Sequence, residues 1–124
     1  MIKINISKIQ EEIYNLICKK NSDNVYFNSI PRETDFSKGY YIAYKLESIS
    51  DGEYKNEIML TVTFASAIDN YTLEEKALET DEDLNKAMLT NGRIIRQNVW
   101  LTNYTDNEEK TKNIVLQYYI NIYE

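Results

Sequence analysis

Strict alternation of apolar and polar side chains is the feature that most constrains the fold of this chain, because period-two patterning is typical of half-buried β-strands. It runs through residues 39–48 and again through residues 56–66. The apolar faces consist of Tyr40, Ile42, Tyr44 and Leu46 in the first stretch and of Ile58, Leu60, Val62 and Phe64 in the second. The turn dipeptide Asp51-Gly52 lies in the polar loop between them, which predicts an antiparallel hairpin.

Two more strands are expected at the end of the chain and a short one near its beginning. Residues 111–123 alternate cleanly, residues 93–104 are more apolar throughout, and the polar loop 105–110 separates them. This arrangement predicts a terminal hairpin. Residues 24–30 form a shorter β-type run that Pro31 stops.

Two segments show helical signals instead. Residues 7–20 open on a Ser7-to-Gln10 capping box and then carry one apolar face, made of Ile9, Ile13, Leu16 and Ile17. Residues 69–91 contain a second capping box at Thr72–Glu75 and end at Asn91-Gly92, a good helix stop. Within this second segment, residues 80–83 are either a kink or the start of a new helix.

The expected elements occur in the order α–β–β–β–α–β–β. This order predicts an α+β fold with an antiparallel β-sheet and helices packed on one face of it. The length of 124 residues fits one domain, so we expect a single domain over residues 1–124.

Composition excludes most enzyme classes. The chain has no histidine, which removes the usual general base and the commonest transition-metal ligand. Its glycines form no phosphate-binding motif. We therefore expect no catalytic residue, no cofactor and no metal. No apolar run approaches the 18 or so residues of a membrane span, so no membrane partner is expected.

The negative charge is concentrated in residues 69–91. The whole chain has 14 basic and 20 acidic residues, a net charge of −6. Seven acids against two lysines give this segment −5 of that total; the acids are Asp69, Glu74, Glu75, Glu79, Asp81, Glu82 and Asp83. Asp81 and Asp83 could offer oxygens to a hard cation, but no EF-hand spacing supports such a site. A solvated acidic face or a partner surface is the favoured interpretation.

Arg93, Arg96 and Trp100 form the one compact basic and aromatic group. Arginine and tryptophan are enriched at interface hot spots, so the group is a candidate anchor for a protein partner. Alternatively, Trp100 packs in the core and the arginines flank a strand. Adjacent tyrosines at 40–41 and 118–119 place rings on both faces of their strands, which suits a sheet face covered by a partner subunit.

The sequence resembles the tail terminator, or tail completion, proteins of long-tailed bacteriophages and of related phage-tail-like particles. The resemblance spans nearly the whole chain and depends on the order of its segments. A short helix leads to a VYF strand ending before proline, and the later segments are GYYIAYKLESIS, EIMLTVTFASAID, a helical part and NIVLQYYINIYE.

This resemblance implies a structural role without catalytic residues or cofactors. Such subunits form a homo-oligomeric ring, a hexamer, which caps the tail tube, stops its polymerisation and joins it to the head connector. In a contractile tail the ring also contacts the sheath protein. The implied location is the virion tail, after synthesis in the host cytoplasm, and DNA only passes through the lumen of the ring.

Three groups of residues are candidate partner contacts. The loop residues Asp51, Gly52, Glu53, Tyr54 and Lys55 are the candidate contact with the tube. Glu82 and Asp83 are candidates for an acidic lumen wall, which would repel the DNA backbone. Arg93 and Arg96 complete the set.

Other interpretations stay open at this stage. The chain could be another phage neck component, such as a head-completion or stopper protein. It could also be a small acidic intracellular module that neutralises a basic partner, as an antitoxin does. A metal-dependent hydrolase is the last alternative.

Overall fold

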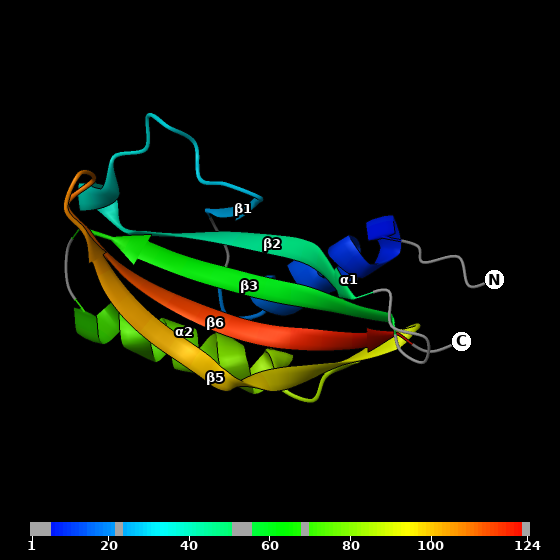
Figure 1. Ribbon diagram of the computed structural model, residues 1–124. Coiled ribbons are helices and arrows are strands. Elements are labelled where there is room, and N and C mark those ends of the chain that lie inside the picture. The colour runs from blue at the N-terminus through cyan, green and yellow to red at the C-terminus, as the bar shows by residue number, and fades with distance from the viewer. Residues whose placement is uncertain (1–5, 22–23, 51–55, 68–69, 123–124) are drawn as a thin grey trace.

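The computed structural model describes residues 6–21, 24–50, 56–67 and 70–122. Within these residues, two α-helices and six strands alternate along the chain, with a short 3-10 helix before the second strand (Figure 1). Their bounds are α1 Ile6–Cys18, β1 Val25–Phe27, the 3-10 helix Phe36–Lys38, β2 Tyr40–Ser50, β3 Asn56–Ser66, α2 Asn70–Leu84, β4 Met88–Leu89, β5 Gly92–Asp106 and β6 Thr111–Ile122. The predicted α+β class and the order α–β–β–β–α–β–β are confirmed, with β4 as an added short strand.

The six strands form one sheet in the order β1-β2-β3-β6-β5-β4. The predicted hairpins are present: β2 pairs antiparallel with β3, and β5 pairs antiparallel with β6. The sheet is mostly antiparallel, as predicted, and β1 is the exception because it runs parallel to β2. The long connection over residues 28–39 returns the chain to the end from which β1 started, as a parallel pair requires.

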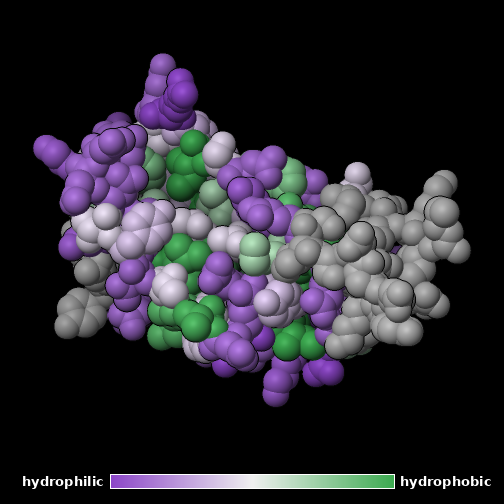
Figure 2. Space-filling view, in the orientation of Figure 1, coloured by the Kyte–Doolittle hydropathy of each residue, from purple (hydrophilic) through white to green (hydrophobic). Residues whose placement is uncertain are grey.

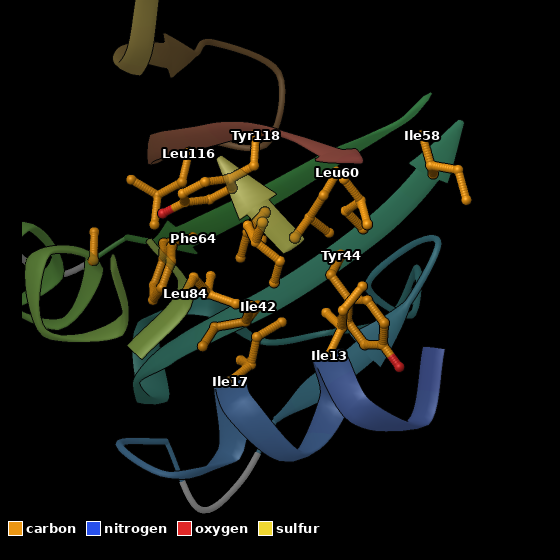
Figure 3. Packing of buried hydrophobic residues seen from close by; sticks show 14 of the residues in the cluster. Ile13, Ile17, Ile42, Tyr44, Ile58, Leu60, Phe64, Leu84, Leu116 and Tyr118 are labelled. Atoms are coloured by element: carbon orange, nitrogen blue, oxygen red, sulfur yellow. The ribbon is translucent and has the colours of Figure 1, made fainter. Parts of the chain in front are cut away.

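Both helices cover the same face of the sheet (Figure 1). The alternating apolar residues of the strands point to that face, where α1 contributes Ile13 and Ile17 (Figure 3). The fully buried large side chains include Ile42, Leu60, Val62, Phe64, Leu84, Ile94, Leu116, Tyr118 and Ile120. In the part of the chain that the structure describes, no α-helix covers the opposite face of the sheet, where the 3-10 helix packs through Phe36.

Helix α1 ends at Cys18, close to the expected boundary, and Asn21 caps it. The side-chain Nδ2 of Asn21 donates to the carbonyl oxygen of Ile17 at 2.8 Å and to Oγ1 of Thr80 at 2.8 Å. Tyr40 donates to Oδ1 of the same asparagine at 2.8 Å. This buried amide thus joins both helices to the start of β2.

The second predicted helix is too long. Helix α2 runs unbroken from Asn70 to Leu84, without the kink or new start considered at residues 80–83. The chain then takes a left-handed backbone at Lys86, with φ of 64°, which ends the helix. Residues 88–89 pair with β5 as strand β4, so Asn91 lies in the turn between these two strands and Gly92 begins β5. Neither residue lies at a helix end.

Candidate interaction surface

A buried carboxylate anchors α2 to the sheet. Asp81 is only 2% exposed, although it belongs to the most acidic stretch of the chain. Arg96 of β5 forms a salt bridge with it, in which Nε donates to Oδ1 at 3.2 Å and Nη2 contacts Oδ2. The hydroxyl of Tyr118 on β6 donates to the same Oδ1 at 2.7 Å. The interpretation of Asp81 as part of a solvated face or a cation site is therefore wrong, because both of its oxygens are committed inside the protein.

The surroundings of this carboxylate also fix the protonation of its partners. Burial, followed by the hydrogen bond to Asp81, raises the pKa of Tyr118 far above its ordinary value. The hydrogen bond to Asp81 likewise raises the pKa of Arg96. Both side chains therefore hold their protons at neutral pH, and the cluster is suited to holding elements together and not to proton transfer.

Arg96 and Trp100 do form a compact group, as predicted. The guanidinium carbon of Arg96 lies 3.9 Å from the centroid of the Trp100 ring, which is a cation–π contact. Trp100 is half-buried and packs against the core. Arg93 lies near the start of β5, opposite Asn121 of β6. A contact of either arginine with a partner stays a prediction.

A large bulge shapes β5 next to this group. Arg96 pairs with Tyr118, whereas the next paired residue, Leu101, faces Leu116. Residues 97–100 of β5 therefore stand opposite Gln117 alone. The sequence did not indicate this irregularity, because residues 93–104 mix apolar and polar side chains without a regular period. Val99 lies within the bulge, and its side chain is 62% exposed.

The remaining acids of α2 lie mostly at the surface. Glu74, Glu75 and Glu82 are exposed, and Asp83 is half-buried. The acidic face predicted for this segment is thus present without Asp81. Among the residues described, no group of three or more histidine, cysteine, aspartate or glutamate side chains could hold a metal ion.

The paired tyrosines point to opposite faces of the sheet, as expected. Tyr118 is buried in the core, and its neighbour Tyr119 is half-buried on the face opposite α1 and α2. Tyr41 lies on that same face, where Phe36 packs edge-on against it with ring centroids 5.5 Å apart. Hydrophobic residues form separate patches between hydrophilic ones in the view of Figure 2.

The predicted tube contact is the loop of residues 51–55. Asp51, Gly52, Glu53, Tyr54 and Lys55 lie outside the described residues. Within the described residues, no helix is long and apolar enough to cross a membrane.

The sequence matches no family model and no curated protein. Among solved structures, it is similar to a chain from the virion of a native gene transfer agent particle, with a TM-score of 0.65 and 13% identity. That match covers 94% of this chain and 96% of the other. A second solved structure, which carries no functional name, matches with a TM-score of 0.55 and 13% identity over 93% of this chain and 96% of that one. At this identity the likenesses show a shared fold.

Proposed function

We propose that the chain is a structural component of a phage-like virion. The observation that supports this most is the likeness to a chain of a gene transfer agent virion, which extends over nearly the full length of both chains. The segment order of tail terminator proteins, present in the sequence, points to the same kind of particle. Asp81 and Tyr118, which are both buried, are occupied in joining α2 to the sheet, which suits a structural role.

Within such a particle, the proposed role is that of a ring that caps the tail tube. The ring stops polymerisation of the tube and offers its other face to the head connector; in a contractile tail it also meets the sheath. The exposed acids of α2 suit a lumen through which DNA slides, since like charge keeps the phosphate backbone from binding. Loop 51–55 is the proposed contact with the tube.

The test is to find the chain in the particle. Cells that make the particle express the chain with a C-terminal tag, and purified particles are labelled with gold against the tag and imaged. We expect label at the head-proximal end of the tube, and tubes of irregular, greater length when the gene is deleted. Particles of normal length without the chain, or label along the whole tube, would contradict the proposal.

A binding comparison separates the cap from other neck components. Purified chain is mixed with isolated tail tubes and, separately, with isolated head portals. Association with tube ends is expected. Association with portals alone would assign the chain to head completion instead.

A further inference from the structure

Strand β1 forms one edge of the sheet and is held there by few contacts. It is three residues long, whereas its neighbour β2 and the central strand β3 have eleven residues each. Val25 and Tyr26 are half-buried and Phe27 is exposed, so no side chain of β1 is fully buried. Strand β3, in contrast, buries every second side chain. A segment with few buried apolar contacts opens at a lower free energy than the core of the same protein.

Both ends of β1 are bounded by a left-handed backbone. Asn24, directly before the strand, has φ of 64°, and Asn28, directly after it, has φ of 73°. This conformation is unfavourable for most residues that have a side chain, and asparagine tolerates it better than most. The outermost hydrogen bonds between β1 and β2 are made at these two residues. The amide of Asn28 donates to the carbonyl oxygen of Tyr44 at 2.8 Å, and the amide of Ile42 donates to that of Asn24 at 2.8 Å.

The segment that carries β1 is anchored on both sides of the strand. Before it, the buried side chain of Asn21 is bonded to both helices and to Tyr40. After it, the 3-10 helix is attached to the end of β3, where the amide of Ala67 donates to the carbonyl oxygen of Phe36 at 3.1 Å. Residues 28–35, between β1 and the 3-10 helix, are mostly exposed. None of the hydrogen bonds at either anchor involves β1, so β1 can separate from β2 without breaking them.

Strand β1 covers only part of the edge of β2. It pairs with residues 42–44, and no other described strand pairs with that side of β2, which continues to Ser50. The ring of Phe27 packs against that of the buried Tyr44, with centroids 5.3 Å apart. Separation of β1 would uncover one side of Tyr44 and extend the unpaired edge from residues 45–50 to residues 42–50. Unpaired strand edges are where other chains add to a sheet, so β1 limits this exposure while it is in place.

We propose that β1 is a gate strand, which separates from β2 and returns to it while the rest of the sheet stays folded. Asn24 and Asn28 are its hinges, since the left-handed backbone at both positions is needed only when β1 lies on β2. In the closed state the gate strand covers Tyr44 and shortens the open edge. In the open state residues 42–50 form one continuous edge. This conformational change is a property of the isolated chain and does not depend on the proposed role in a virion.

Native-state hydrogen exchange tests the gate strand, because two amides report on it directly. The amides of Asn28 and Ile42 bond between β1 and β2, whereas the amides of Leu60 and Val62 belong to β3, which is paired on both sides. Each rate is divided by the intrinsic rate of that amide. We expect the two reporter amides to exchange about 100-fold faster than those of Leu60 and Val62, or more. Low concentrations of urea should leave the reporter rates unchanged, since a local opening exposes little surface.

A substitution in the distant core separates local opening from global unfolding. Ile94 is fully buried on β5, and β2, β3 and β6 lie between it and β1. Ile94→Val should accelerate exchange in β3 about fivefold, because these amides exchange when the whole chain unfolds. It should leave the rates of Asn28 and Ile42 unchanged, because the core stays folded when the gate strand opens. Equal acceleration of both sets of amides would show that β1 opens only with the whole chain and would overturn the proposal.

Substitutions of Asn28 test the hinge. Alanine is less favourable than asparagine in a left-handed backbone, so Asn28→Ala should open the gate strand more often and accelerate exchange of the Ile42 amide about tenfold. Asn28→Gly should keep this rate close to that of the wild type, because glycine accepts positive φ without strain. Asn91→Ala is the matched control, since Asn91 is an exposed turn asparagine without positive φ. If Asn28→Ala does not fold, Asn24→Ala takes its place.

Two further sets of results would contradict the gate strand. The first is a wild-type chain in which the reporter amides match those of β3 in rate and in urea dependence. The second concerns the hinge: an Ile42 rate that alanine at position 28 does not change, or that glycine at this position or Asn91→Ala raises as much. None of these measurements involves a particle, so their failure would leave the proposed virion role in place, and absence of the chain from particles would leave the gate strand in place.

Discussion

Asp81 is a buried acid that anchors α2 to the sheet, although the acid next to it in the sequence is exposed. Glu82, beside it on α2, is exposed, whereas Asp81 points to the sheet and is 2% exposed. A buried carboxylate is costly to desolvate, and its salt bridge to Arg96 and hydrogen bond from Tyr118 offset that cost. Together these contacts determine how α2 lies on β5 and β6.

Replacing Asp81 should therefore destabilise the fold more than replacing an adjacent acid. Asp81→Ala leaves the Tyr118 hydroxyl buried without an acceptor and Arg96 without its counter-ion, a loss of about 2–3 kcal/mol in unfolding free energy. Arg96 is partly exposed, which keeps the loss below that of a fully buried pair. Glu82→Ala should change the unfolding free energy by no more than about 0.5 kcal/mol. Urea denaturation measures both, and equal losses would contradict the anchoring role.

Tyr118 predicts a particular dependence on pH. Tyr118→Phe should lose about 1–2 kcal/mol at neutral pH, because a buried hydrogen bond is removed. The pKa of Tyr118 is raised in the folded state, so its contribution is complete below the unfolded pKa of about 10 and falls by about 1.4 kcal/mol per pH unit above it. The difference in unfolding free energy between wild type and Tyr118→Phe should therefore become smaller between about pH 9 and about pH 11, which lie one unit below and one unit above that pKa.

Urea denaturation across that range is the measurement for Tyr118→Phe. Tyr104→Phe is the control, since its ring is 51% exposed, and its gap from wild type should stay constant. A gap for Tyr118→Phe that is the same at both ends of the range would show that the hydroxyl is not held by the folded state.

The backbone of β5 approaches that of β6 closely at Gly92, the first residue of β5. A Cβ added to Gly92 would lie 2.8 Å from the backbone oxygen of Asn121 on β6, which cannot move without parting the strands. Gly92→Ala should cost about 1–3 kcal/mol for this reason. Gly39→Ala is the matched control, because nothing lies within 4 Å of the added carbon. Thermal unfolding compares the two, and similar melting temperatures would contradict the close packing of β5 on β6.

The sequence predicted best the elements in which buried apolar residues recur at a regular spacing. Strands β2, β3 and β6 follow from alternation, and α1 follows from its capping box and apolar stripe. The parallel pairing of β1 and the bulge of β5 were not predicted, because both depend on partners distant in sequence. Asp81 was missed because acids surround it. Its spacing from Leu73 and Ala77, four residues apart each, places it on the buried side of α2 and would have been a signal.

At the scale of the whole molecule, negative charge is concentrated on α2, and the exposed acids of this helix suit the wall of a lumen. In the proposed ring, Glu75→Lys combined with Glu82→Lys should preserve assembly but slow DNA passage, since a basic wall binds phosphates. Asp83, the other lumen candidate, is half-buried and is left unchanged to protect the fold. Glu108→Lys combined with Glu109→Lys makes the same change in charge on the exposed β5–β6 turn.

The readouts for this charge reversal are particle assembly by electron microscopy and DNA delivery by the particles. Delivery should fall for the α2 variant and stay normal for the turn variant. Unchanged delivery by the α2 variant would remove the lumen assignment, without bearing on whether the chain caps the tube.

The loop between β2 and β3 is the proposed contact between the ring and the tail tube. The two strands that carry it pair from Tyr40↔Ser66 to Ser50↔Glu57, so the hairpin is held by its own ladder up to the loop. Replacing residues 51–55 with the two-residue turn Asn-Gly should therefore leave the fold and the subunit contacts intact. It should abolish capping, because the proposed tube contact is gone, and tubes should grow beyond their normal length. Tubes of normal length made with this variant, shown by circular dichroism to be folded, would move the tube contact to another surface of the ring.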